Sequence, residues 1–172
     1  MPQSPPADDA DLYPLDDIGA VFATLPHCNE IGMEGVDIRR GECIVRIDYQ
    51  DRLVGNPDTG VVHGGVVTIL LDTAAGGAAF TLIPRGATLA TLDLRIDYLK
   101  PATVGRAILA YAHCYKLTRS IAFVRGVAYH ETVDEPIANC TASFMTSSVG
   151  FRVNAPSSSG PSSANPEGGG DT

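Results

Sequence analysis

The chain of 172 residues has few basic residues, and they form no cluster. Its 12 Lys and Arg are scattered along the sequence, and the formal net charge is −8 at pH 7. Nucleic-acid-binding proteins neutralise phosphates with a concentrated basic surface. We therefore expect no nucleic-acid partner, whereas an anionic small molecule needs only a few local Arg.

Signals for metal binding, nucleotide binding and secretion are missing as well. The Cys and His residues have no C-x-x-C or other ligand spacing, and no Walker, dinucleotide or G-x-S-x-G motif occurs. The N-terminus lacks the basic stretch and apolar run of a signal peptide. We expect no metal, no cofactor and a cytoplasmic location, with buried, reduced thiols at Cys28, Cys43, Cys114 and Cys140.

The two ends of the chain differ from its middle. Residues 154–172 are mostly Ser, Gly, Pro, Ala and Asn, which bury too little apolar area to offset the entropy of ordering. Residues 1–15 hold four Pro and three Asp and show no apolar period. The composition predicts one folded domain over residues 16–153, between a disordered acidic, Pro-rich arm (1–15) and a disordered tail (154–172).

The longest apolar stretch of the chain spans residues 61–83. Its length would allow it to cross a membrane. However, it contains His63, Asp72 and four Gly, and segments of alternating polarity typical of a sheet follow it. We interpret it as a helix buried inside a globular fold rather than as a membrane span.

Alternation of apolar and polar residues predicts five strands around this helix. The expected strands are 42–49, 92–98, 104–117, 121–131 and 137–147. A short helix is expected over residues 16–25. Short connections favour antiparallel pairing, so the chain is expected to be an α+β protein in which a curved antiparallel sheet wraps around one long central helix.

Asp72 is the first candidate for a functional residue, because burial of a carboxylate in apolar surroundings is unfavourable without a use for it. Asp72 shares one helix face with Gly65, Thr68, Gly76 and Ala79, because these residues follow one another along the helix at spacings of three or four. Small side chains on this face let a ligand or another backbone approach closely. For Gly76 and Ala79, close packing against the sheet explains the pattern equally well.

The start of the same helix offers a second set of groups. Gly64 and Gly65 present backbone N–H groups at the positive end of a helix, where a carbonyl oxygen that gains negative charge would be stabilised. Gly64 and Asp72 are eight residues apart, or about 12 Å along the axis at ~1.5 Å per residue. A base must lie within roughly 3 Å of the proton it removes. If both groups act on one carbonyl, they come from two chains related by two-fold symmetry.

Three motifs also carry a resemblance to a known family. They are Gly60-x-x-His63-Gly64-Gly65 with Asp72, then Ala90-Thr91-Leu92-Asp93-Leu94, then Tyr98-Leu99-Lys100-Pro101-Ala102. Together they resemble the PaaI-type hotdog-fold thioesterases, over roughly residues 31–148. The resemblance implies the hotdog fold, hydrolysis of acyl-CoA thioesters to free acid and CoA, and a homodimer that often pairs into a dimer of dimers.

The same resemblance assigns roles to individual residues. It implies that Asp72 activates water or attacks directly, and that the N–H of Gly64 polarises the thioester carbonyl. It places His63 and Asn56 near the carbonyl and the attacking water or leaving sulfur, and Thr91 where a hydroxyl orients the water. The candidates for binding the substrate, including its CoA part, are Gly65, Lys100, Arg119 and Ser120.

Two alternatives of the same fold stay open at this point. A non-catalytic acyl-CoA-binding module would keep Gly64 and the cavity without needing Asp72. An enoyl-CoA hydratase or dehydratase would pair a His with an acid in a different arrangement. The sequence also leaves open whether the acyl group is aromatic or aliphatic, whether Asp72 acts as base or nucleophile, and how two dimers associate.

Overall fold

The structure, a computed structural model, describes residues 12–146. The predicted tail (154–172) and most of the predicted arm (1–15) lie outside the described residues, so both stay predictions. The described part begins slightly before the expected start of the domain at residue 16. Leu12 forms an isolated bridge with Pro84, and the Tyr13 ring packs 4.6 Å from that of Phe80.

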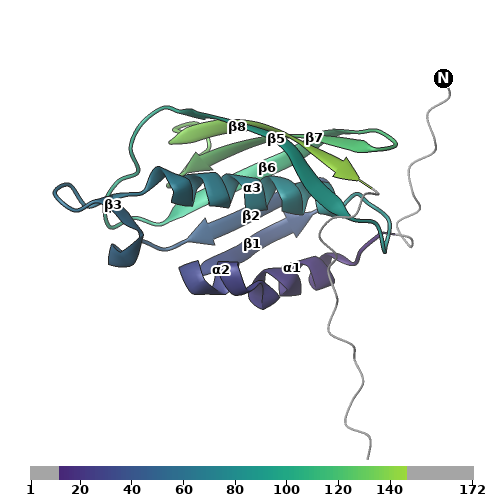
Figure 1. The fold of residues 1–172 in the computed structure, drawn as a ribbon, viewed down its shortest axis with the longest axis horizontal. Helices are drawn as coiled ribbons and strands as arrows, with labels where there is room; N and C mark the ends of the chain where they lie inside the picture. Colours follow the sequence, from purple (N-terminus) through teal and green to yellow (C-terminus); the bar gives the residue numbers. More distant parts are fainter. Residues whose placement is uncertain (1–11, 147–172) are drawn as a thin grey trace, which may run out of the picture.

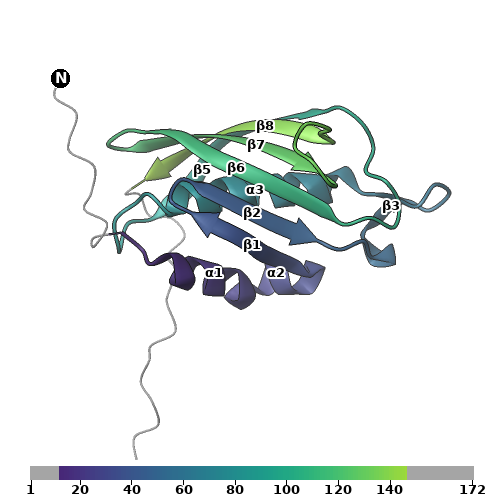
Figure 2. The ribbon, with the colours of Figure 1, turned by 180° about the vertical axis from the view of Figure 1, so that it is seen from behind.

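A six-stranded antiparallel sheet curves around the central helix α3 (Gly64–Phe80), which confirms the expected fold class (Figures 1 and 2). The strand order is β1-β2-β6-β7-β8-β5. The strands are β1 (Met33–Arg39), β2 (Glu42–Ile47), β5 (Leu89–Tyr98), β6 (Ile108–Leu117), β7 (Ile121–Tyr129) and β8 (Ala138–Thr146). Two short helices, α1 (Leu15–Thr24) and α2 (Pro26–Ile31), lie along the β1 side of this sheet.

Helix α3 is buried along most of its circumference, as the apolar run predicts. Leu70, Leu71 and Ala74 are fully buried among the core side chains of the sheet. Gly77 allows the helix to approach β2, because a Cβ at this position would lie 2.8 Å from the Cys43 Sγ atom. The helix begins at Gly64 rather than at residue 61, since Val61 and Val62 form the short strand β4 (Val61–Val62).

Strand β5 pairs with β8 and not with β6, its neighbour in the chain. The pairing places Leu89 opposite Thr146 and Tyr98 opposite Ala138, and a register shift occurs between Thr91 and Asp93. The other side of β5 has no neighbouring strand within the described chain. This edge position leaves most of its side chains half-buried or exposed.

The sequence pattern missed several elements. They are β1, α2, β4, the short strand β3 (Val54–Asn56) and the 3₁₀ turn Asp51–Leu53. Strand β1 lacks a clear alternation because it is an edge strand with a register shift between Gly35 and Asp37, and its Val36 is exposed. Bulges and glycines in edge strands remove the period-two signal on which the prediction depends.

All four cysteines are free and buried, as expected from the sequence. Burial raises the pKa of the Cys43 thiol to about 12 and that of Cys140 to about 11, with nearby Asp37 and Asp72 adding to the respective shifts. These thiols are therefore poor nucleophiles near neutral pH. Within residues 12–146, no helix is both long enough and apolar enough to cross a membrane.

Candidate active site

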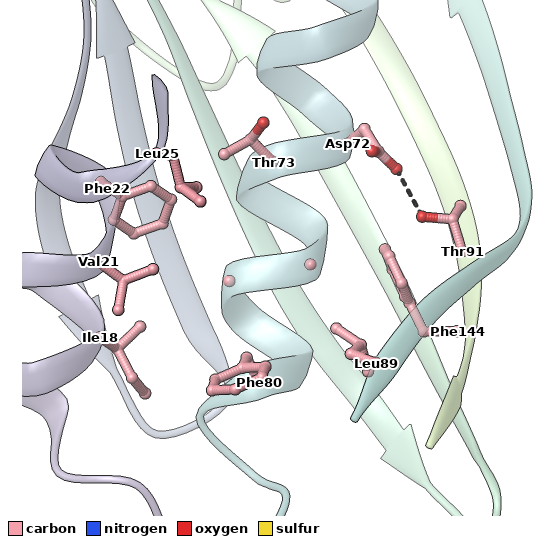
Figure 3. A pocket seen from close by; sticks show the side chains of 12 residues that line it. Ile18, Val21, Phe22, Leu25, Asp72, Thr73, Phe80, Leu89, Thr91 and Phe144 are labelled. Carbon is pink, nitrogen blue, oxygen red and sulfur yellow. Dashed lines mark hydrogen bonds between the residues drawn. The ribbon is translucent and has the colours of Figure 1, made fainter. Parts of the chain in front are cut away.

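Asp72 lies midway along α3 on the side that faces β5, and it is only half-buried. Its Oδ1 atom accepts a hydrogen bond of 3.1 Å from the Thr91 hydroxyl of β5 (Figure 3). Burial raises the pKa of the Asp72 carboxyl above its ordinary value, and the hydrogen bond from Thr91 lowers it in part. A carboxylate with a raised pKa is a stronger base than a solvated one, and it still reaches open space.

That space is a pocket of about 210 Å³ on the face of α3 that the sheet leaves uncovered. Asp72 and Thr91 lie at one side of it (Figure 3), and Gly76 and Gly77 of α3 line it between its two sides. The remaining lining residues are Ile18, Val21, Phe22, Leu25, Thr73, Phe80, Leu89 and Phe144. A single carboxylate at the polar side of an apolar pocket is the arrangement expected of a reactive site.

His63 caps the start of α3. Its Nδ1 atom accepts a hydrogen bond of 2.9 Å from the Gly65 N–H, so in the neutral ring the proton is on Nε2. Residue 65 must be small here, because a Cβ would lie 2.8 Å from Nδ1. The Gly65 N–H, which the sequence analysis considers as a substrate contact, thus already donates to His63. The Nε2–H of the exposed His63 remains available as a donor.

The Gly64–Gly65 peptide is held from its other side by Tyr98. The Tyr98 hydroxyl donates to the Gly64 carbonyl at 2.9 Å and lies 2.7 Å from the Thr68 hydroxyl. Thr68 also donates to the Gly64 carbonyl at 3.3 Å. Within residues 12–146 the Gly64 N–H has no hydrogen-bond acceptor. The Gly64 N–H, which the sequence analysis considers as an oxyanion donor, is therefore available.

Tyr98 and Thr68 are site residues to which the sequence analysis gave no role. Thr68 was noted on the small-residue face of the helix, and Tyr98 belongs to a motif already quoted. Their contact depends on where β5 ends relative to the start of α3, which the pairing of β5 with β8 decides. The spacing of residues in the sequence does not predict the distance between the end of β5 and the start of α3.

Asn56 lies in the hairpin between β3 and β4, beside the start of α3. A Cβ on the neighbouring Gly55 would lie 2.7 Å from the His63 Cα atom, which shows how closely the hairpin packs on this residue. The Asn56 Oδ1 atom accepts the Asp58 N–H at 3.0 Å and stabilises the turn. The side-chain amide N–H groups of Asn56 make no hydrogen bond within the described chain.

Two sets of residues are thus separated along α3. Asn56, His63 and Gly64 lie at its start, whereas Asp72 and Thr91 lie about two turns further on, at ~1.5 Å per residue. The pocket that contains Asp72 includes none of the three residues at the helix start. One described chain therefore does not bring the two sets to a common point.

The candidate CoA-binding residues are also far from one another in the fold. Arg119 and Ser120 form the exposed turn between β6 and β7, and the Ser120 carbonyl accepts the N–H of Thr146 at the end of β8. Lys100 follows β5 at the opposite end of the β5–β8 pair, where its N–H donates to the Ile137 carbonyl. A single chain therefore does not combine the Lys100 and Arg119 ends into one anion site.

No group of three or more His, Cys, Asp or Glu side chains is arranged to hold a metal ion anywhere between residues 12 and 146. The site offers polar groups of other kinds. These are one carboxylate, one hydroxyl that orients it, and backbone and imidazole N–H donors.

Comparisons with known proteins show the family to which the chain is similar. A family model described as the Thioesterase superfamily matches residues 59–137. The medium/long-chain acyl-CoA thioesterase YigI of Escherichia coli is 30% identical over 142 residues, which cover 74% of this chain and 90% of YigI. A relative from Halobacterium salinarum is 40% identical over 75 residues, so that the match spans 42% of this chain and only 50% of that relative.

A solved structure completes the comparison. A mutant of the phenylacetic acid degradation protein PaaI from Thermus thermophilus matches with a TM-score of 0.62 and 26% sequence identity, covering 70% of this chain and 98% of PaaI. The chain therefore belongs to the thioesterase superfamily, as a PaaI-type hotdog-fold thioester hydrolase.

Proposed function

We propose that the protein hydrolyses acyl-CoA thioesters, with Asp72 as the group that activates water or attacks the carbonyl. The observation that carries this proposal is the Asp72 carboxylate, whose pKa is raised by burial and which Thr91 orients at the edge of an apolar pocket. The relative YigI, named as a medium/long-chain acyl-CoA thioesterase, supports the choice of CoA thioesters.

With Asp72 as a base, the reaction takes the following course. The carboxylate removes a proton from water while the water oxygen bonds to the thioester carbon. The Gly64 N–H and the Nε2–H of His63, both from the partner subunit, stabilise the oxyanion that results. The tetrahedral species then collapses, the C–S bond breaks, and the CoA sulfur leaves with a proton returned from Asp72. With Asp72 as a nucleophile, its oxygen bonds to the thioester carbon and the C–S bond breaks, so that a mixed anhydride forms and CoA leaves as the thiolate. Water then hydrolyses the anhydride to the free acid and the Asp72 carboxylate, and the proton that water releases passes to the thiolate.

The active site is shared between two subunits in this proposal. An antiparallel pair of α3 helices would place Gly64, His63 and Asn56 of the partner subunit opposite Asp72, and two-fold symmetry would create two such sites. The uncovered face of α3 and the free edge of β5, with exposed Leu92 and Leu99, support pairing at this surface.

The same symmetry accounts for the separated CoA candidates. An antiparallel pair brings the Lys100 end of one subunit beside the Arg119 end of the other, so that both cations flank one site entrance. Arg119 has no ion-pair partner among residues 12–146, and its guanidinium is suited to a CoA phosphate. We extend the assembly to a dimer of dimers on the family pattern.

Replacement of Asp72 by Asn tests the catalytic role. With acyl-CoA substrates and a thiol reagent, D72N is expected to release CoA at least about 100-fold more slowly than the wild type, the lower bound for a positioned base. D48N is a suitable control, because Asp48 is exposed, pairs with Arg46 and lies away from the pocket. Activity of D72N within severalfold of the wild type would overturn the assignment.

The same assays separate the alternative functions. Saturable binding of acyl-CoA by a wild-type protein that releases no thiol would indicate a binding module. Conversion of an enoyl-CoA to the hydroxyacyl-CoA without thiol release would indicate a hydratase.

A further inference from the structure

The pocket beside Asp72 has two walls of different origin. Thr91, Leu89 and Phe144 line it from β5 and β8 on the Asp72 side of α3. Helix α1 lines it from the other side with Ile18, Val21 and Phe22, and Leu25, which directly follows α1, extends this wall. Figure 3 shows these side chains on the side of α3 opposite to Leu89, Thr91 and Phe144. A group that enters beside Asp72 and crosses Gly76 therefore meets α1.

The Phe22 ring, part of the α1 wall, packs closely against two glycines. The Phe22 ring lies 3.0 Å from where a Cβ on Gly35 of β1 would be, and 3.1 Å from where one on Gly77 of α3 would be. The ring therefore fills a slot between the strand and the central helix, and only 5% of Phe22 is exposed. Close packing of this kind leaves the wall little freedom to move outward.

We propose that α1 closes the acyl-binding end of the active site and restricts the enzyme to apolar acyl groups of short to medium length. This inference rests on the thioesterase function proposed above. The acyl chain leaves the carbonyl beside Asp72, crosses Gly76 and Gly77, and ends against Val21, Phe22 and Leu25.

The chemistry of the walls selects against polar acyl groups. Beyond Asp72, Thr73 and Thr91, every side chain that lines the pocket is apolar. A hydroxyl carried to the α1 end would lose its hydrogen bonds to water without gaining a partner, which is unfavourable. A hydroxylated arylacetyl group is therefore expected to be a poor substrate. An arylacetyl group without the hydroxyl does not lose these hydrogen bonds.

The size of the pocket sets the limit on length. A cavity of about 150 Å³ lined by apolar side chains holds one benzene molecule. The pocket of about 210 Å³ holds somewhat more than that, which suits a medium acyl chain and excludes a long one unless it extends past α1.

Gly76 offers a substitution that narrows the pocket without straining the fold. A Cβ at this position would lie 3.7 Å from the Phe144 Cε1 atom and 4.0 Å from the Leu89 Cδ2 atom, which are ordinary contacts. Ala is also a better helix former than Gly. In G76A the ratio of kcat/KM for decanoyl-CoA to that for butyryl-CoA is expected to fall about tenfold or more, the effect of one methyl group in an apolar pocket.

Gly19 supplies the matched control. It lies in α1, a Cβ there would meet only the Ile38 Cδ1 atom at 3.7 Å, and Gly19 does not line the pocket. G19A is expected to keep the wild-type order of acyl-CoA preference. Thermal unfolding of both variants checks that each folds and that only G76A changes the chain-length ratio.

A second variant enlarges the α1 end. Leu25 is only partly buried, so L25A removes part of the wall with a smaller loss of stability than truncation of Phe22. L25A is expected to raise the ratio for decanoyl-CoA over butyryl-CoA, opposite to G76A. In the wild type, kcat/KM is expected to be highest for hexanoyl- or octanoyl-CoA and lower for palmitoyl- and 4-hydroxyphenylacetyl-CoA.

The outcomes distinguish this inference from the proposed function. If the wild type releases thiol from no acyl-CoA, the thioesterase function fails and the inference fails with it. If the wild type is active but folded G76A and L25A keep its chain-length profile, only the role of α1 is overturned. A preference for the hydroxylated aryl substrate would also overturn it.

Discussion

At the scale of single residues, burial and the hydrogen bond from Thr91 have opposite effects on the pKa of the Asp72 carboxyl group. Burial raises the pKa of Asp72, and the hydrogen bond from the Thr91 hydroxyl lowers it, because that bond stabilises the charged form. The base is active only when it is ionised. Activity is therefore present above the raised pKa and is lost as the pH falls through it.

Substitution of Thr91 by Val removes this hydrogen bond and keeps the shape of the side chain. The pKa of Asp72 is then expected to rise further, so that the acidic limb of the kcat/KM profile moves to higher pH. Steady-state kinetics across pH 4–9 measure the shift, with T141V on the exposed face of β8 as a control. An unchanged limb, or one moved to lower pH, would contradict this role for Thr91.

At the scale of elements, the start of α3 depends on groups from three segments. His63 accepts a hydrogen bond from the Gly65 N–H. Tyr98 at the end of β5 and Thr68 within the helix both donate to the Gly64 carbonyl. The peptide between Gly64 and Gly65 is thus held at both its oxygen and its nitrogen. Such fixation keeps the direction of the neighbouring Gly64 N–H constant, which favours stabilisation of an oxyanion.

We therefore propose that Tyr98 acts as a positioning residue, through its hydrogen bond to the Gly64 carbonyl. Y98F is expected to lower kcat by up to about tenfold with little change in KM, since one neutral hydrogen bond contributes about 0.5–1.5 kcal/mol. Y115F is the matched control, because Tyr115 is exposed on β6 and packs near Arg125 away from the pocket. An unchanged kcat would contradict the role, and so would a loss of activity that follows a lower Tm.

At the scale of the whole molecule, the central question is which chain supplies each half of the site. Asp72 shares its pocket with Thr91 but not with Asn56, His63 or Gly64. If both sets of residues act on one carbonyl, as we propose, the distance along α3 makes the activity depend on assembly. A two-fold pair of chains is the smallest arrangement that brings both halves together.

Mixing of two inactive variants tests this dependence. One carries D72A, and the other carries substitutions of both Asn56 and His63. After complete subunit exchange, about a quarter of the wild-type activity is expected, because half of the random pairs are mixed and each mixed pair has one intact site. The activity is measured after mild dissociation and reassociation.

The control for this experiment is exchange of each variant with itself, followed by confirmation of mixed pairs by mass spectrometry. Absence of activity in confirmed mixed pairs would show that both halves of the site come from one chain.

The sequence alone was sufficient for the parts of the fold that depend on local pattern. The apolar run predicts α3, and alternation predicts β2 and the strands from β5 onward, because burial of one face imposes a period on the residues. The unfavourable position of Asp72 in that run is also a local signal. Strand β1 escaped prediction because an edge strand with Gly35 and a bulge has no such period.

The tertiary structure alone decided which distant groups meet. Thr91 binds Asp72, and Tyr98 binds the Gly64 carbonyl, because β5 pairs with β8 in a register that aligns it along α3. Helix α1 faces the same pocket because Phe22 fits between Gly35 and Gly77. Periodicity reports which face of an element is buried, whereas long-range pairing and packing determine what lies against that face, and no short stretch of sequence encodes that choice.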